Sequence, residues 1–310
     1  MSYIVKKRLK NRDYFYVVSN IKLKGKTKKF QVYIGTKKPE VRKLPKYSKI
    51  LQKRIENFLL KTDPLLSIVS KSDLRDMEKV KKWYKSLSRQ SPAIKQNYYE
   101  WFITTFTYDS NAIEGSTLSL RETAMALFEG ISPAGKPLRD VIAAENHKKA
   151  FDWIVLYKGN INKQFILKLH RILTNNILNP SDSGKIRKVQ VYVRGTKEIP
   201  PKPQEVELQL KALLNWYKSN KKRYSPVIIA SYFHTAFEGI HPFIDFNGRT
   251  GRLLLNFILI KNGYPPIDIR NKDRQRYYSA IRSAITGDLK LFVNLVIKYL
   301  KGLIKTQYIS

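Results

Sequence analysis

Two strongly apolar helical segments joined by a short polar loop are the feature that most constrains how this chain can fold. The first segment begins at Ser225, where a capping hydroxyl is followed by proline at the first helical position. The second covers residues 253–260 and ends before Gly263 and two prolines, as helices commonly do. Helices this apolar are expected to be buried. The polar loop at residues 241–252 therefore joins two core helices.

This loop is dense in side chains that carry chemistry. The groups of interest are His241, Asp245, Asn247, Gly248, Arg249, Gly251 and Arg252. Backbone N–H groups at the start of a helix point outward with partial positive charge, so this position favours a bound anion, above all phosphate. The two glycines let the backbone approach such an anion closely.

The spacing of these groups indicates separate roles. Arg249 and Arg252 are three residues apart, so they share one face of the first helical turn and can hold two phosphates. Asp245 offers a hard oxygen to a magnesium ion that bridges the phosphates. His241 titrates near neutrality and is suited to take a proton from an attacking hydroxyl. A lone histidine is usually structural, but the ordered set on a loop entering a helix favours a site.

At these residues the chain resembles the Fic family, whose loop runs His-x-Phe-x-Asp/Glu-Gly-Asn-Gly-Arg-x-x-Arg. Members typically transfer AMP from ATP to a Ser, Thr or Tyr hydroxyl of a target protein. The resemblance implies ATP and Mg²⁺ as ligands, with His241 as the base and Asp245 as the metal ligand. It also implies a set of phosphate binders: Asn247, Gly248, Arg249, Gly251 and Arg252.

One position of the loop departs from the family pattern. Phe246 stands where the pattern has glycine. If the backbone at this position is left-handed, a phenylalanine costs about 1 to 2 kcal/mol there.

A second stretch, Ser110-Asn-Ala-Ile-Glu114-Gly115, resembles the inhibitory helix motif of Fic proteins, Ser/Thr-x-x-x-Glu-Gly/Asn. By that resemblance Glu114 pairs with Arg252, and an arginine held by an internal carboxylate cannot orient the ATP γ-phosphate. The free energy of such a pair suits a switch, because about 1.4 kcal/mol shifts an equilibrium tenfold.

Residues 188–194 predict a strand, and Gly195 with Thr196 predicts a hairpin turn after it. Alternate side chains face opposite ways: Val189, Val191 and Val193 on one side, Gln190 and Tyr192 on the other. The hairpin resembles the Fic flap, which pairs its main chain with the target segment. A plain surface hairpin fits the local sequence as well.

The remaining aromatic and imidazole groups have less specific surroundings. By the resemblance, Tyr277 or Tyr278 flanks the adenine ring, while core packing fits these residues at least as well. Structural roles are predicted for Asn146, His147, His170 and His234.

The N-terminal part of the chain is basic and has the pattern of a sheet. Residues 3–5, 14–18 and 30–34 predict three strands joined by two hairpins. Of a net charge of +35, residues 1–50 carry +14, from 16 Lys and Arg against 2 Asp and Glu. Such a surface attracts anions, nucleic acid among them. The alternatives are that the aromatics are simple core and the charges a solvated exterior.

We therefore predict a mainly α fold in three parts. Residues 1–40 form a small basic antiparallel β-sheet appendage and residues 41–95 a helical linker region. Residues 96–310 form a Fic-type helical catalytic domain with a β-hairpin flap and the inhibitory helix. The absence of cysteine excludes disulfides and Cys-ligated metals. No apolar run reaches the length of a membrane span and the start lacks a secretion signal, so we expect a cytoplasmic protein without membrane partners.

Three functions fit these features. The first is an adenylyltransferase acting on a target protein and autoinhibited by Glu114. The second is removal of AMP, with Glu114 aligning the attacking water. The third is a nucleic-acid-binding regulator that uses residues 1–50 and carries a degenerate nucleotide-binding Fic domain. Phosphate transfer is less favoured, because the loop has Asn-Gly-Arg where phosphorylating relatives have Asn-Lys-Arg. The sequence leaves open the target and whether two copies pair as a homodimer.

Overall fold

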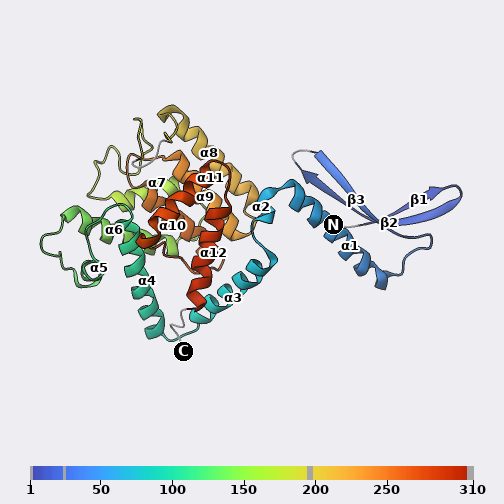
Figure 1. Ribbon diagram of the computed structural model, residues 1–310, viewed down its shortest axis with the longest axis horizontal. Coiled ribbons are helices and arrows are strands. Elements are labelled where there is room, and N and C mark those ends of the chain that lie inside the picture. Colours follow the sequence, from blue (N-terminus) through green and yellow to red (C-terminus); the bar gives the residue numbers. More distant parts are fainter. Residues whose placement is uncertain (1–2, 24–25, 194–197, 306–310) are drawn as a thin grey trace. The chain divides into compact units, whose positions relative to one another are not determined.

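The computed structural model describes residues 3–23, 26–193 and 198–305. The chain divides into two compact units, Met1–Ile68 and Val69–Ser310 (Figure 1). Among the described residues, no helix has the length and apolar character that crossing a membrane requires.

The first unit is a three-stranded antiparallel sheet with a helix packed on one face. Its elements are β1 (Tyr3–Leu9), β2 (Arg12–Leu23), β3 (Lys26–Gly35), a short 3₁₀ turn (Val41–Lys43), α1 (Leu44–Thr62) and α2 (Pro64–Ser67), with sheet order β1-β2-β3. Val17, Val32 and Leu51 form the buried core between sheet and α1. The predicted three strands and first hairpin are confirmed, and its turn uses Lys10 and Asn11 at positive φ. The turn of the second hairpin, at residues 24–25, lies outside the described residues.

The second unit is helical throughout its described regular structure. Its longer helices are α3 (Lys71–Leu87), α4 (Pro92–Ala112), α6 (Leu138–Leu156), α7 (Lys163–Thr174), α8 (Pro203–Asn220), α9 (Pro226–Ile240), α10 (Asn247–Lys261), α11 (Arg274–Ile285) and α12 (Lys290–Lys305). Shorter pieces are α5 (Leu120–Ala124), a π-helical turn (Met125–Glu129) and a 3₁₀ turn (Asn271–Asp273). The predicted mainly α class is confirmed.

Helices α9 and α10 lie at the centre of this unit, as the two apolar segments predicted (Figure 1). They pack on each other, while α8, α11 and α12 pack on α9, and α6 and α7 pack on α10. Ser225 caps α9 by accepting a hydrogen bond from the Ile228 N–H. Every side chain from Leu253 to Leu259 is buried. An apolar surface on all sides requires neighbours on all sides, so the loop between the two helices is held from both ends.

The predicted strand of the flap is corrected by the structure. Residues 188–193 are irregular, and the predicted turn at 195–196 lies outside the described residues. Gln190 Nε2 donates a hydrogen bond to the Pro200 carbonyl at 3.0 Å, so a side chain joins the two sides of the segment. Pro200 and Pro201 have no N–H to donate to a strand ladder. In the described residues, no strand pairs with this alternating pattern.

Candidate active site

The loop between α9 and α10 begins at His241 in an unusual backbone conformation. His241 has φ 50° and ψ 61°, which is left-handed and costs a residue other than glycine about 1 to 2 kcal/mol. Two hydrogen bonds hold this turn: Arg187 Nε donates to the His241 carbonyl at 2.8 Å, and the Arg187 N–H donates to the Pro242 carbonyl at 3.0 Å. Arg187 is buried and also donates to the carbonyls of Val189 and Pro201. One side chain thus links the flap segment to the start of the loop.

The His241 imidazole has the tautomer that a base requires. Its Nδ1 lies 3.2 Å from the Glu238 carbonyl oxygen. Because a carbonyl oxygen can only accept, Nδ1 carries the proton and Nε2 keeps its lone pair. Burial is the main cause that lowers the pKa of His241 below its ordinary value of 6.5. The ring is therefore neutral at pH 7 and able to accept a proton.

Asn247 and His170 fix the path of the loop. Asn247 is buried, accepts from the Phe243 N–H at 2.9 Å and donates to the Phe243 carbonyl at 2.8 Å. Both ends of the amide that was predicted to bind phosphate are thus used inside the loop. His170 donates from Nε2 to the Asp245 carbonyl at 3.1 Å, accepts from the Gly184 N–H at 2.9 Å, and stacks on Phe243. Burial lowers the pKa of His170 to about 4, so it is a neutral core residue, as predicted.

Phe246 occupies the left-handed position where the Fic pattern has glycine. Its φ is 62° and its ψ is 15°, and its ring is buried. The Arg249 guanidinium carbon lies 3.5 Å from the centre of that ring. A cation–π contact contributes about 0.5 to 2 kcal/mol, which is similar in size to the left-handed strain of about 1 to 2 kcal/mol. The phenylalanine therefore offsets its own strain by holding Arg249 in place.

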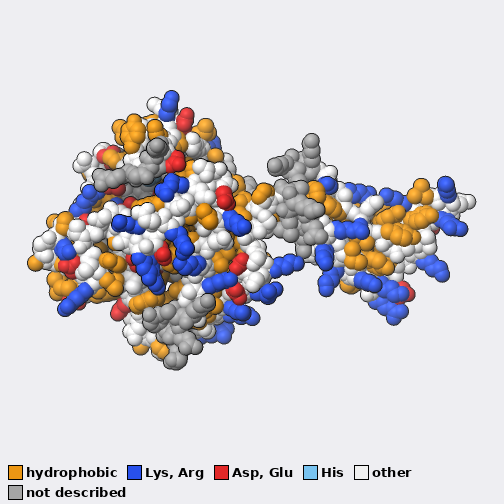
Figure 2. All heavy atoms as spheres, viewed as in Figure 1, with side chains coloured by type: hydrophobic (Ala, Val, Ile, Leu, Met, Phe, Trp, Pro, Cys, Tyr) orange, Lys and Arg blue, Asp and Glu red, His pale blue; other side chains and the backbone are white. Residues whose placement is uncertain are grey.

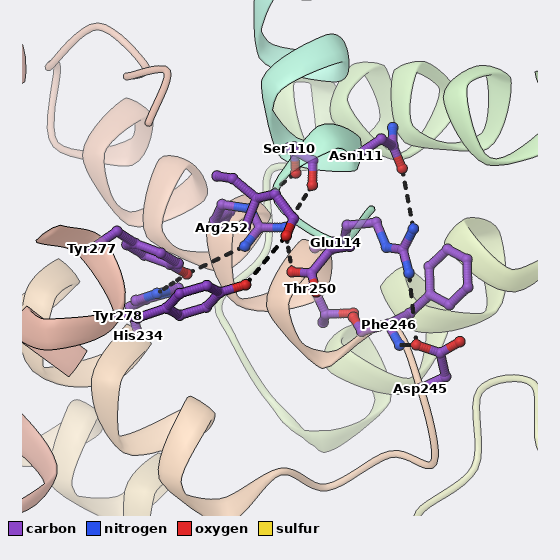
Figure 3. A network of polar contacts seen from close by, with 12 residues as sticks. Ser110, Asn111, Glu114, His234, Asp245, Phe246, Thr250, Arg252, Tyr277 and Tyr278 are labelled. Atoms are coloured by element: carbon purple, nitrogen blue, oxygen red, sulfur yellow. Dashed lines mark hydrogen bonds and ion pairs between the residues drawn. The ribbon is translucent and has the colours of Figure 1, made fainter. Parts of the chain in front are cut away.

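Arg252 is the most heavily bonded side chain of the site and is 1% exposed. Its Nη2 donates to Glu114 Oε1 and to the Ser110 carbonyl, both at 2.8 Å, and its Nε donates to Ser110 Oγ at 3.0 Å. Figure 3 shows Ser110, in the last turn of α4, and Glu114, in the turn after that helix, directed toward this guanidinium. Gly115 follows at φ 96°, where glycine is favoured. The structure thus brings together the two side chains whose pairing the sequence predicted.

The two loop glycines make room for carboxylates of the protein itself. A Cβ built on Gly248 would collide with the Glu114 carboxylate, and one on Gly251 would collide with the Glu238 carboxylate. A Cβ on Gly251 would also lie 3.0 Å from the His234 ring. The sequence predicted that these glycines let the backbone approach a bound anion closely, whereas the groups found beside them are carboxylates of the protein. The space is at present shared with Glu114 and Glu238.

Glu238 is a functional candidate that the sequence reasoning missed. It lies on α9 one turn before His241, and its Oε1 is buried without a hydrogen-bond partner in the described part of the chain. Burial raises the pKa of Glu238 to about 8, so most molecules carry a protonated Glu238 at pH 7. It is the one acidic residue in the apolar segment 226–240, and acidic groups are almost never fully buried without a partner. The contrast between this acid and its apolar neighbours could have marked Glu238 in the sequence.

Asp245 faces solvent with basic partners around it. Its Oδ2 lies 2.7 Å from Arg139 Nη2, and its Oδ1 accepts from the Phe246 N–H at 2.6 Å and lies 3.6 Å from Arg249 Nη2. The side chain is 40% exposed. Mg²⁺ in phosphate sites is held by one or two carboxylates plus the phosphates, so this single carboxylate fits that ion. Arg139, which the sequence did not reveal, would have to release Oδ2.

The two tyrosines of α11 lie in different surroundings. Tyr277 is 1% exposed, and its hydroxyl contacts His234 Nε2 at 2.9 Å and Arg252 Nη1 at 3.3 Å. It lies in the core, the alternative that the sequence left open. Tyr278 is partly exposed and donates to the Ile113 carbonyl at 3.3 Å (Figure 3). His234 is buried, as predicted.

Comparisons with known proteins find relatives over most of the chain. A family model described as the Fic/DOC family matches residues 160–259. The protein adenylyltransferase fic-1 of Caenorhabditis elegans is 33% identical over 256 residues, covering 81% of this chain and 49% of that protein. The protein adenylyltransferase Fic of Nematostella vectensis is 31% identical over 260 residues, covering 82% and 56%. The chain thus spans about half the length of these curated relatives.

Solved structures of Fic proteins are also similar to this chain. The structure of a part of Fic-1 from C. elegans has a TM-score of 0.67 at 31% identity, covering 79% of this chain and 73% of that chain. A Fic-domain-containing signalling protein from Bacteroides thetaiotaomicron has a TM-score of 0.68 at 24% identity, covering 74% and 94%. At that identity the second likeness concerns the fold alone.

Proposed function

This chain belongs to the Fic/DOC family, and on that premise we propose that it transfers AMP from ATP to a hydroxyl group of a target protein. The observation that carries the proposal is the state of His241: its Nδ1 carries the proton, so its Nε2 keeps a lone pair, and it begins the loop that leads into the N-terminus of α10. A base beside an anion-binding helix end suits chemistry at a phosphate. The relatives named above carry the name protein adenylyltransferase.

In the proposed reaction, the acceptor hydroxyl oxygen forms a bond to the α-phosphorus of ATP, and the bond from that phosphorus to the bridging oxygen breaks. Pyrophosphate leaves, and His241 Nε2 takes the hydroxyl proton. Arg249 and Arg252, with the first N–H groups of α10, oppose the charge that develops on the phosphate oxygens. Bound Mg²⁺, held by Asp245, would supply further charge neutralisation between the phosphates.

We propose that Glu114 restrains this activity. It accepts one of the two N–H groups of Arg252 Nη2, which would otherwise be available to the γ-phosphate. Arg252 would keep hydrogen bonds to Ser110 and Tyr277 if Glu114 left. Because the guanidinium would not be stranded without partners, releasing Glu114 costs less than breaking an isolated buried ion pair, which takes about 3 to 5 kcal/mol. A contact that can be released in this way suits a switch.

The flap segment is proposed to receive the target. Val189 and Tyr192 are 58% and 76% exposed, and Arg187 anchors the segment beside His241. The residues assigned to target positioning are Val189, Gln190, Val191, Tyr192 and Val193. Main-chain pairing tolerates many sequences, so this segment would place an acceptor hydroxyl near the base without selecting one target. Tyr278 is the remaining candidate to flank the adenine.

Removal of AMP is the second candidate, and the exposure of Glu114 favours it. The Glu114 side chain is 28% exposed and uses Oε1 for Arg252. Its other oxygen could orient a water molecule for attack on a phosphorus already bound to a protein hydroxyl. In that case Glu114→Gly would abolish release of AMP from a modified target, whereas it should stimulate AMP transfer.

Two labelled forms of ATP test the proposed reaction. The Glu114→Gly variant is incubated with Mg²⁺ and ATP labelled at either the α- or the γ-phosphate, and label on protein is measured. Adenylyl transfer retains the α label and releases the γ label with pyrophosphate. Retention of the γ label alone would mean phosphate transfer and would overturn the proposal.

A further inference from the structure

The sheet of the first unit has one face that α1 leaves uncovered. Side chains alternate along each strand, and the register places four tyrosines together on this face. Tyr16 lies opposite Tyr33, with ring centres 5.5 Å apart, and Tyr14 lies 6.1 Å from Tyr33. Tyr3 of β1 lies on the same face, where its hydroxyl accepts a hydrogen bond from Asn20 of β2. Val17 and Val32, which form the core with α1, point the other way.

Basic and amide side chains share this face with the tyrosines. We call the set the tyrosine face: Tyr3, Lys7, Arg12, Tyr14, Tyr16, Asn20, Lys29, Gln31 and Tyr33, which the strand register places on one side together with the apolar Val5, Leu9 and Val18. It contains no Asp or Glu. Lys7 Nζ lies 5.0 Å from the centre of the Tyr16 ring and donates to Gln31 Oε1 at 3.3 Å. The face is therefore basic and aromatic around a buried Val18.

The two acids of residues 1–50 are already paired within the first unit. Asp13 lies 2.7 Å from Lys6, and Glu40 lies 2.6 Å from Arg42 and 3.2 Å from Lys43. Residues 1–50 keep a net charge of +14 with both of their acids counted. Figure 2 shows Lys and Arg side chains spread over this unit, at the right of the view. A surface of this kind attracts a polyanion with regularly spaced charges.

We propose that the tyrosine face binds double-stranded DNA through the major groove. Neighbouring strands lie about 4.8 Å apart, so the outer strands of this sheet are separated by about 10 Å, close to the major-groove width of about 12 Å. The lysines and arginines then meet the phosphates on either side, while amide and hydroxyl groups face the base edges. The inference is independent of adenylyl transfer, because it concerns the other unit of the chain.

The contacts of the tyrosines favour duplex DNA over single strands and RNA. Base stacking needs an open ring face, but Tyr16 is covered by Lys7, and the rings of Tyr14 and Tyr16 are tilted against Tyr33 by 42° and 53°. The rings of Tyr14, Tyr16 and Tyr33 are therefore partly taken up by contacts with one another and with Lys7. The major groove of double-stranded RNA is too deep and narrow for side chains to read.

Fluorescence anisotropy of the full chain tests the proposal. The probes are a labelled 20-base-pair DNA duplex of mixed sequence, the matching single strand and an RNA duplex, each from 50 to 200 mM salt. We expect the DNA duplex to bind most tightly. The variant Lys7→Gln/Lys29→Gln should bind roughly tenfold or more weakly at 0.1 M salt, with the salt slope reduced by about 1.8, because two phosphate contacts are lost.

The matched control is Lys46→Gln/Lys49→Gln, which removes the same charge from exposed positions on α1. Circular dichroism checks that both double variants keep the fold. We expect the control to retain the wild-type salt slope. Equal weakening in both variants would reduce the effect to net charge and overturn the proposal. Tighter binding of the single strand or the RNA duplex, or no DNA binding at 50 mM salt, would also overturn it.

Discussion

The loop between α9 and α10 and the tyrosine face of the first unit both hold cationic groups, but they hold them in opposite ways. In the loop, Arg252 is buried and bonded to Glu114 and Ser110, and Arg249 is stacked on Phe246. On the tyrosine face, the cations lie at the surface and no acid shares the face. A site whose charges are satisfied internally must exchange partners before it binds an anion, whereas an open site binds at once. The first arrangement suits a regulated enzyme and the second a docking surface.

The largest expected effect separates the two regions by chemistry. We expect His241→Ala, in the Glu114→Gly background, to lower AMP transfer by about 10² to 10⁴-fold, because general base catalysis contributes that much. Alanine is strained at a left-handed position, so His241→Asn is the second variant, since asparagine tolerates this backbone. Label from α-labelled ATP measures the rate. DNA binding should be unchanged in both variants, and its loss would break the comparison.

The second expected effect is a difference in salt dependence between the two regions. Raising salt from 50 to 200 mM is expected to weaken DNA binding by more than tenfold, because exposed phosphate contacts are lost. The ratio of AMP transfer between Glu114→Gly and wild type should change little over the same range, because a buried pair is weakly screened. Parallel assays in one buffer series measure both. A ratio that falls toward one as salt rises would show that the Glu114 contact behaves as a surface ion pair.

The strain at Phe246 can be isolated by two variants that remove the same ring. Both Phe246→Ala and Phe246→Gly lose the buried ring and its contact with Arg249, so both should be destabilised, by about 2 to 5 kcal/mol. Only glycine regains left-handed freedom, so Phe246→Gly should be more stable than Phe246→Ala by about 1 kcal/mol. Denaturant unfolding measures the difference. Equal stability would mean that the left-handed backbone carries no strain.

The last expected effect concerns Glu238 and depends on pH. Its folded pKa of about 8 lies above the ordinary 4.5, so the folded protein keeps a proton that the unfolded chain releases. Stability from this group is therefore present below pH 4.5 and is lost as pH rises toward 8. We expect Glu238→Gln to melt higher than wild type at pH 8, with a difference that falls toward zero below pH 4.5. A difference independent of pH would contradict a protonated Glu238.

Local patterns predicted the helices well because their causes are local. The cap at Ser225, the stop at Gly263 and the apolar run between residues 253 and 260 each act within a few residues. The loop chemistry was also readable, because its residues are contiguous. Phe246 could be flagged from sequence as a position of left-handed strain, while the guanidinium that stacks on it could not.

The sequence did not reveal the groups that reach the loop from far along the chain. Arg187 and Arg139 contact His241 and Asp245 across 54 and 106 residues, and no local pattern marks such partners. The flap strand failed for a related reason. Its alternation was correct locally, but the returning segment includes Pro200 and Pro201, which have no N–H to donate, and no strand pairs with it in the described residues. Long-range partners decide both cases.

The central claim is that Arg252 is held by Glu114 and that releasing it activates the site. Intact mass spectrometry of wild type, Glu114→Gln and Glu114→Gly after incubation with ATP and Mg²⁺ tests it most directly. We expect an added adenylyl group that is scarce on wild type and at least tenfold more abundant on Glu114→Gly, with Glu114→Gln between them. Equal labelling of all three proteins, or labelling confined to wild type, would contradict it.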